Sequence, residues 1–496
     1  MLLKYLKFNN FKKEYFLYAL IIGGCYSPVF TSSYIIIDDW NKWKASITAI
    51  LKHEIMIGRF FNGLMLLLFK PFNTIGEICT IRFISVVTVV IYCCMLYNFI
   101  RKKTIIDDST SFFLPLFSVF LPSFVVNVSF AAMFAVPTSL IFSLLSYNLI
   151  RNSQGEIKFS SKVVKLLFAL SCIAISFNIY QISAMCFLVP LLLELCFGKE
   201  ILDKKKIIQI MAILLFGMLL TFFVISFISP LILQLSTQRT SLTTDFSDKI
   251  LWFKDYILPY AVCNFAIAPS FVYKIFSWGL FSSGFFYIVV KKGLIVGSFV
   301  IFMIIMAYSQ NLIVEESVIY ARTFSAISML CLVIEIIGLN NLLNFFGLYT
   351  SKIHRIIFSS LLLAVVIITQ KHIQEQFVLP SKIEYYSLYK ELNSLPKGKP
   401  VQVIIYSSSN WDDGLSSPGY YTDFVANYSL WPAFSALYEV EYIIKINKID
   451  NIQLYKSPFF TREGENEINL LVDKEKKGDL YIIDTKNIIQ KNGNMV

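Results

Sequence analysis

Long apolar stretches alternate with short polar connections along the first three quarters of the chain. A helix needs about 20 predominantly apolar residues to cross the hydrocarbon core of a bilayer. We therefore predict a polytopic α-helical membrane protein with about eleven transmembrane helices, near residues 15–36, 80–100, 111–128, 130–150, 163–179, 181–197, 207–232, 264–290, 293–309, 321–346 and 356–371.

Every second connection between these stretches is basic. The basic residues are Lys4, Lys7, Lys12 and Lys13; Arg101, Lys102 and Lys103; Arg151, Lys158, Lys162 and Lys165; Lys199 and Lys204, Lys205 and Lys206; Lys291 and Lys292; and Lys352 and Arg355. Cytoplasmic loops carry an excess of Lys and Arg. This pattern predicts a cytoplasmic N-terminus, and eleven spans then put the C-terminal segment outside the cytoplasm.

The hydrophobic pattern changes after residue 370. Short β-like runs at 401–406, 442–446 and 480–483 are separated by turn signals, and a helix is expected over 382–394. We therefore divide the chain into a transmembrane domain, residues 1–370, and a small extracytoplasmic α/β domain, residues 371–496.

The composition excludes an ordinary soluble enzyme. Hydrophobic residues make up 56% of the chain and charged residues 16%, whereas soluble domains have about 25% charged residues. The net charge of +11 does not indicate a nucleic-acid partner. Residues 371–496 hold 14 Lys and Arg against 16 Asp and Glu, so the basic excess, 30 against 17, lies among the apolar stretches.

No disulfide framework or protein-built metal site is expected. All nine cysteines precede residue 332, mostly in apolar runs where cysteine packs as a small hydrophobe. The three histidines are widely spaced and accompany no CxxC or HxxxH pattern. We predict no cofactor. A divalent cation held by a pair of aspartates is the less favoured alternative.

Two adjacent carboxylates, Asp38 and Asp39, follow the first apolar stretch. A carboxylate at a membrane boundary is costly unless it faces water or a partner. Burial and a like-charged neighbour would raise the pKa of one of them, which suits a general base. The alternative is an interfacial pair that caps the next helix.

The segment from Trp40 to Leu68 lies in the predicted external loop 38–78 and is too polar for an ordinary span. We expect a pair of amphipathic helices in the membrane interface. Arg59 would lie near the surface, where a guanidinium can clamp a phosphate or extend to bulk lipid. Trp40, His53 and Glu54 are candidates for contacting substrate.

These features resemble the bacterial serotype-converting glucosyltransferases that modify O-antigen, the Gtr type II family within the GT-C class of membrane glycosyltransferases. The resemblance rests on Tyr34–Asp39, Gly58-Arg59, Ala321-Arg322, the multispan plan and the polar tail. It implies a location in the bacterial cytoplasmic (inner) membrane. It also implies Asp38 or Asp39 as catalytic base, and Arg59 and Arg322 as ligands of the donor phosphate.

The resemblance further implies an inverting glycosyltransferase. It would move a sugar, with glucose as the family default, from a polyprenyl-phosphate donor to a lipopolysaccharide O-antigen, another polysaccharide or a lipid-linked oligosaccharide. Such an enzyme needs a base for the acceptor hydroxyl, cations for the leaving phosphate and an apolar groove for the lipid. The alternatives are a polysaccharide polymerase and a transporter or flippase of lipid-linked saccharides.

Overall fold

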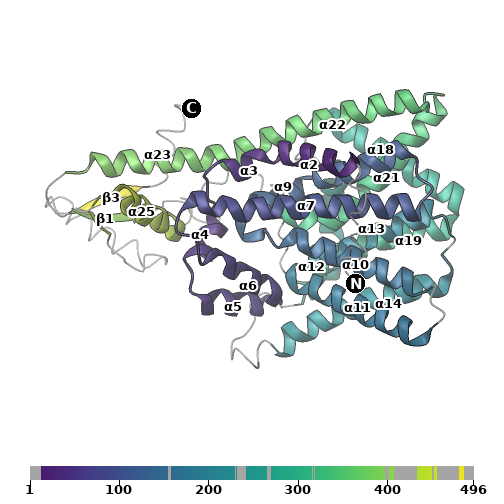
Figure 1. The fold of residues 1–496 in the computed structure, drawn as a ribbon, viewed down its shortest axis with the longest axis horizontal. Helices are drawn as coiled ribbons and strands as arrows, with labels where there is room; N and C mark the ends of the chain where they lie inside the picture. Colours follow the sequence, from purple (N-terminus) through teal and green to yellow (C-terminus); the bar gives the residue numbers. More distant parts are fainter. Residues whose placement is uncertain are drawn as a thin grey trace.

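A computed structural model describes residues 13–154, 158–200, 202–228, 231, 242–264, 270–315, 317, 319–396, 401–406, 433–449, 452–454 and 480–484. Helices dominate these ranges, and the longest of them lie side by side along the long axis of the molecule (Figure 1). The structure is therefore that of a polytopic helical membrane protein.

Within the described ranges, seven helical stretches are long and apolar enough to cross a membrane. They are α7 (Ile75–Lys103), η2 (Ala131–Met133) with α10 (Val136–Ser153), α11 (Phe159–Ile179), α14 (Lys204–Phe223) with η4 (Val224–Ile228), α18 (Phe271–Lys292), η6 (Ala321–Phe324) with α21 (Ser325–Phe345), and the continuous run of α22 (Ser351–Ile373), η7 (Gln374–Val378) and α23 (Leu379–Ser394). An eighth is added if α8 (Asp108–Val119) and α9 (Pro122–Ser129), which meet at a 53° bend, form one span.

The other predicted spans are shorter helices. They are α2 (Lys13–Cys25) with α3 (Ser27–Thr31), α12 (Gln181–Ala184) with η3 (Met185–Phe187) and α13 (Leu188–Phe197), and α19 (Leu294–Ala307). Each coincides with a predicted stretch, but by length alone these helices do not qualify as spans. The count of eleven therefore stays a prediction.

Sequence signals at the ends of α7 explain where this helix begins and ends. Thr74 and Glu77 form a capping box, in which each side chain accepts a hydrogen bond from the other residue's backbone N–H. The last turn carries Arg101, Lys102 and Lys103, whose charges favour the negative end of the helix dipole. Between these two ends, α7 runs along the length of the bundle (Figure 1).

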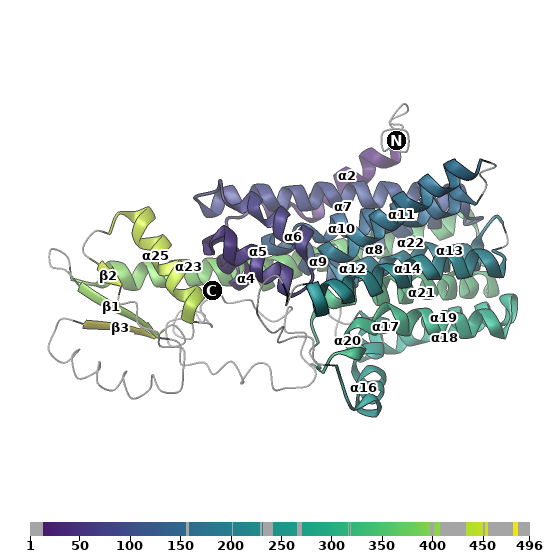
Figure 2. The same ribbon diagram turned by 90° about the horizontal axis from the view of Figure 1, so that it is seen from below.

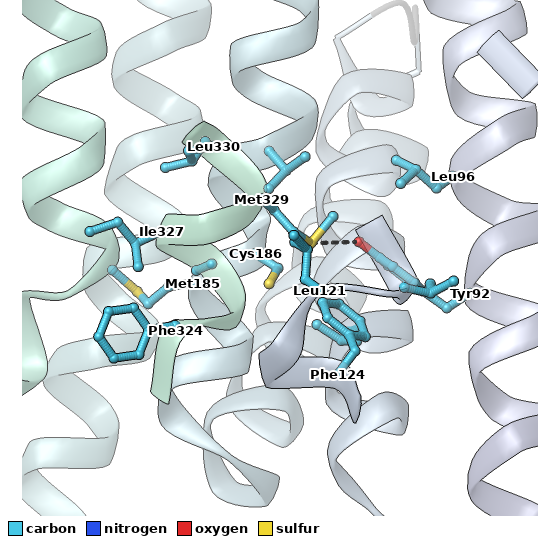
Figure 3. Packing of buried hydrophobic residues seen from close by; sticks show 14 of the residues in the cluster. Tyr92, Leu96, Leu121, Phe124, Met185, Cys186, Phe324, Ile327, Met329 and Leu330 are labelled. Atoms are coloured by element: carbon cyan, nitrogen blue, oxygen red, sulfur yellow. Dashed lines mark hydrogen bonds between the residues drawn. The ribbon is translucent and has the colours of Figure 1, made fainter. Parts of the chain in front are cut away.

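The core joins helices that are distant in sequence. Tyr92 of α7 donates a hydrogen bond to the Met329 sulfur of α21 at 3.7 Å, and Phe124 of α9 packs beside them (Figure 3). Elsewhere α18 and α21 approach closely through Gly284 and Gly338, where an added Cβ would lie 1.9 Å from a carbonyl oxygen of the other helix. Glycine is thus required for this helix contact.

The basic connections gather at one end of the bundle, which we call the basic end. Lys199 donates its backbone N–H to Lys103 at 3.0 Å, and Tyr349 donates its hydroxyl to Asp107 at 2.9 Å. Arg151 lies 2.6 Å from Glu194 of α13. Four basic connections that the sequence separates widely are therefore neighbours.

The alternate connections gather at the opposite end, which we call the cavity end. It contains α4 (Ile37–Lys44), α5 (Ile47–Met56), α6 (Phe60–Leu66) and η1 (Leu67–Phe69), followed later in the chain by α16 (Phe246–Trp252), η5 (Phe253–Ile257), α17 (Leu258–Cys263) and α20 (Ser309–Ile313). Figures 1 and 2 show α4, α5 and α6 packed beside the start of α7, away from the basic end. The predicted amphipathic segment is thus a set of short helices.

The C-terminal part contains α25 (Ala433–Asn447) and three short strands, β1 (Val401–Tyr406), β2 (Ile452–Leu454) and β3 (Leu480–Asp484). The strands are parallel and in the order β2-β1-β3. The expected strand at 442–446 is wrong, because these residues belong to α25, where Val440 and Ile443 are buried on one face. The helix from α22 to α23 continues across residue 370, and the predicted division there stays a prediction.

Candidate functional site

A cavity of about 790 Å³ lies at the cavity end, and we call it the Glu54 cavity. Its charged lining residues are Lys42, Glu54, Arg59 and Arg322, His53 also lines it, and its amide side chains are Asn62, Gln181, Gln310 and Asn311. Its apolar wall comes from α14 and η4, with Leu215, Met218, Leu219, Phe222 and Ile225. The cavity lining therefore combines apolar groups with charged and polar ones.

Glu54 bonds three other side chains of the cavity lining. Its side chain is 2% exposed, and its Oε1 lies 2.5 Å from Lys42 Nζ and 3.2 Å from His53 Nδ1. Its Oε2 accepts a hydrogen bond from Asn62 Nδ2 at 2.9 Å. Burial alone would raise the pKa of Glu54, but the hydrogen bond from His53 and the charges of Lys42 and Arg59 outweigh it and lower the pKa to about 2.

A glycine turn between α5 and α6 brings Arg59 to the cavity. Gly58 has φ +71°, and the backbone N–H of Arg59 donates a hydrogen bond to the Glu54 carbonyl at 2.7 Å. This arrangement is a Schellman motif, which ends α5. An added Cβ on Gly58 would lie 2.3 Å from the Ile225 side chain. Position 58 therefore favours glycine for two reasons: the backbone has a positive φ, and a side chain would collide with η4.

Gln181 fixes this turn against the connection between α11 and α12. Its Nε2 donates to the Ile57 and Gly58 carbonyls at 2.9 and 3.0 Å, and its Oε1 accepts from Arg59 Nε at 3.1 Å. The Arg59 guanidinium also lies 4.5 Å from the centre of the Tyr180 ring. These contacts hold the guanidinium in one position on the cavity wall.

Arg322 reaches the same cavity from η6, more than 260 residues after Arg59 in the chain. Its guanidinium lies 4.6 Å from the centre of the Tyr320 ring, and Tyr320 also lines the cavity. The two arginines that the resemblance paired as phosphate ligands therefore share one cavity. Their role as phosphate ligands stays a prediction.

Asp39 lies outside the cavity lining and is fully buried. Its Oδ2 accepts from Arg82 Nη2 and its Oδ1 from the Ala132 N–H, both at 2.7 Å. Arg82 also donates to the Ser129 and Tyr34 carbonyls at 3.0 and 2.8 Å. Burial raises the pKa of the Asp39 carboxyl, while the Arg82 charge and the Ala132 N–H oppose that rise.

Asp38 and Trp40, the two predicted candidates on either side of Asp39, do not contribute a described side chain to the cavity lining. The backbone of Asp38 belongs to α4, but its side chain lies outside the described residues. Trp40 is fully buried, stacks on Trp43 at 5.4 Å and meets the Tyr442 ring edge-on at 5.9 Å. In this position Trp40 is a packing residue between α4 and α25 and does not line the cavity.

Sequence reasoning assigned no role to Lys42, Asn62, Gln181 or Gln310. Gln181 lies between two apolar stretches, close to a second amide, Asn178, and neither stands out in the sequence. Lys42 and Asn62 offered only their place in the polar segment, since their partner Glu54 becomes apparent only when α4, α5 and α6 fold together. Within the described ranges no group of three His, Cys, Asp or Glu side chains is arranged to hold a metal ion.

Comparison with protein families, curated proteins and solved structures finds no match to this chain. The chemistry of the Glu54 cavity is therefore the main indication of what the protein does.

Proposed function

We propose that the protein is a glycosyltransferase that takes a sugar from a polyprenyl-phosphate donor. The observation that carries this proposal is the Glu54 cavity, whose lining combines apolar side chains of α14 and η4 with three cationic side chains, Lys42, Arg59 and Arg322. A ligand that suits such a cavity has a lipid part and an anionic part. The amide side chains of the same cavity are suited to hydroxyl groups.

The reaction would be a single displacement at the anomeric carbon. An acceptor hydroxyl oxygen forms the new bond to that carbon, the bond to the phosphate oxygen breaks, and the configuration inverts. The hydroxyl proton passes to a carboxylate, and the polyprenyl phosphate leaves with the bonding electron pair. Lys42, Arg59 and Arg322 would neutralise the charge that develops on the phosphate.

The contacts favour Glu54 over Asp39 as the carboxylate that accepts the proton. Glu54 lines the cavity, whereas Asp39 is 0% exposed and lies outside the cavity lining. A carboxyl with a pKa near 2 is a weak base. A donor phosphate that attracts Lys42 away from Glu54 would raise this pKa and strengthen the base. Asp38 remains the second candidate on sequence grounds.

The direction of insertion is part of the proposal. We infer eleven spans with the basic end in the cytoplasm, because Lys and Arg favour that side. The Glu54 cavity and residues 371–496, as an α/β domain, then lie on the outer face of a bacterial cytoplasmic membrane, where the acceptor is O-antigen or another surface polysaccharide. A reporter fused after residue 496 should be extracytoplasmic. A cytoplasmic signal would contradict this orientation.

Sugar transfer by purified protein tests the function. The full chain in lipid nanodiscs receives polyprenyl phosphate linked to labelled glucose, galactose, mannose or N-acetylglucosamine, together with lipid-linked O-antigen. The proposal expects one labelled sugar to join the acceptor and free polyprenyl phosphate to appear. Growth of acceptor chains without a lipid-phosphate donor would indicate a polymerase, and movement of donor across the bilayer without transfer would indicate a flippase. Either result would contradict the proposal.

A further inference from the structure

Asn62 presents a buried acceptor with no hydrogen bond from any described residue. Its side chain is 5% exposed, and its Nδ2 donates to Glu54 Oε2 at 2.9 Å. Its Oδ1 is buried and accepts no hydrogen bond from the residues that the structure describes. Asn62 belongs to the lining of the Glu54 cavity.

The chemistry of Glu54 fixes which atom of the amide is the acceptor. A carboxyl whose pKa is about 2 is ionised at neutral pH and only accepts hydrogen bonds. Turning the amide around would bring Asn62 Oδ1 against a carboxylate oxygen, which is repulsive. The amide nitrogen must therefore face Glu54, and the amide oxygen is left as an acceptor.

A buried acceptor without a donor is destabilising. Buried polar groups in native proteins are rarely left in this state. A second amide of the lining shows the same feature, because Gln310 Oε1 also accepts no hydrogen bond from the described residues. Gln310 Nε2 donates to the Gln181 carbonyl at 3.4 Å.

The missing partner must supply a hydrogen-bond donor. An ionised phosphate only accepts hydrogen bonds and an alkyl chain forms none, so neither fits Asn62 Oδ1. A hydroxyl group can donate. The cations of the cavity suit a phosphate, whereas the amide oxygens suit the hydroxyls of a neutral polyol attached to it.

We infer that Asn62 is a specificity-determining residue that accepts a hydrogen bond from a sugar hydroxyl of the donor, with Glu54 holding its amide in the required orientation. This inference rests on the proposed function and adds the part of the ligand that Asn62 recognises. Gln310 contributes a second acceptor for the same sugar.

The test measures binding of lipids to the full-length protein in nanodiscs. The probes are polyprenyl phosphate, polyprenyl phosphate linked to each of glucose, galactose, mannose and N-acetylglucosamine, and monodeoxy forms of the sugar that binds best. The wild-type protein should prefer that sugar-bearing lipid over bare polyprenyl phosphate. One deoxy donor should bind about tenfold more weakly, the effect of leaving a buried acceptor unpaired.

Two substitutions of Asn62 complete the test. In Asn62→Leu and Asn62→Ala, bare polyprenyl phosphate should bind as in the wild type, while the preference for the sugar falls about tenfold. The sensitive deoxy donor should then bind as well as its parent. Asn127→Leu is the matched control, because Asn127 is also buried with an Oδ1 that accepts no hydrogen bond from the described residues, but it does not line the cavity.

The outcomes separate the inference from the proposed function. If wild-type protein prefers a sugar-bearing lipid and both Asn62 variants keep that preference, the inference is wrong and the proposed function stands. Equal binding of every deoxy donor by the wild type would also overturn the inference, without requiring any variant to fold. If the wild type binds no sugar-bearing lipid better than bare polyprenyl phosphate, the proposed function fails, and the inference fails with it.

Discussion

Two regions of the cavity end each contain a carboxylate paired with a cation, and they differ in what surrounds the pair. Asp39 and Arg82 are both 0% exposed, and their hydrogen bonds go to each other and to backbone groups. Glu54 is also buried, but its partners Lys42 and His53 are 16% and 57% exposed and line a cavity. One pair is enclosed by protein and the other borders a space that a ligand can enter.

This difference in surroundings indicates a structural role for the Asp39–Arg82 pair and a chemical role for Glu54. The Asp39–Arg82 pair connects α4, α7, the extended segment at Tyr34 and the turn at Ala132. Ala132 in turn lines the Glu54 cavity. We therefore expect the enclosed pair to maintain the shape of the cavity end, and the Glu54 pair to meet the ligand.

The largest expected effect is on stability, from Arg82→Met. This substitution leaves the Asp39 carboxylate buried without its cation, and breaking a buried pair in this way costs about 3–5 kcal/mol. Unfolding of the purified protein in detergent would measure the loss. The double variant Asp39→Asn/Arg82→Met should recover part of it, because no buried charge is left unpaired. An unchanged unfolding midpoint in Arg82→Met would show that the pair is not structural.

The next effect is on catalysis, from Glu54→Gln. Loss of a general base reduces turnover by about 10²–10⁴-fold. The measurement is the initial rate of sugar transfer at saturating donor. Glu375→Gln is the matched control, since Glu375 is an exposed partner of Lys371 on α22–η7 and lies outside the cavity lining. A Glu54→Gln variant with wild-type turnover would remove Glu54 from the reaction.

Acidification provides a third test of the Glu54 pair. The pKa of Glu54 is lower in the folded protein than its unfolded value of 4.5, so its ionised carboxylate stabilises the folded state at pH values above 4.5. This contribution disappears as the pH falls from 4.5 toward about 2. The size of the shift corresponds to about 3 kcal/mol. The free energy of unfolding should therefore fall more steeply in this pH window for the wild type than for Glu54→Gln. Parallel curves would contradict the pairing of Glu54 with Lys42 and His53.

The smallest effect is expected from Arg59→Ala. Losing one charge-assisted contact to the donor phosphate should raise the KM for the donor about tenfold, with a smaller change in kcat. Lys52→Ala is the matched control, because Lys52 is an exposed cation on α5 that does not line the cavity. If both variants keep the wild-type KM, Arg59 does not bind the donor.

The sequence predicted the helices of this fold better than it predicted which side chains contact each other. Apolar stretches and basic connections follow from local composition, and they anticipated the helices and the clustering of the basic loops. The partners of Asp39 were not predictable, because they are Arg82 from α7 and the backbone N–H of Ala132, both distant in the sequence. The helical state of residues 442–446 was also not predictable from their β-like composition. These residues belong to α25, which buries Val440 and Ile443 on one face.

Arg59 and Arg322 were proposed together from a resemblance, and the structure brings both to the Glu54 cavity. The amides of this cavity were missed because Asn62, Gln181 and Gln310 come from three separate segments. A single amide in a sequence carries no signal about the groups that folding will place beside it.

The central claim is that the cavity around Glu54 performs the chemistry while the Asp39–Arg82 pair maintains its shape. The most direct test is the rate of sugar transfer per folded molecule, measured for Glu54→Gln and Asp39→Asn in the same nanodiscs with the same donor. We predict that Glu54→Gln is folded and inactive, whereas Asp39→Asn is less stable but nearly as active per folded molecule as the wild type. A folded, inactive Asp39→Asn beside an active Glu54→Gln would contradict the claim.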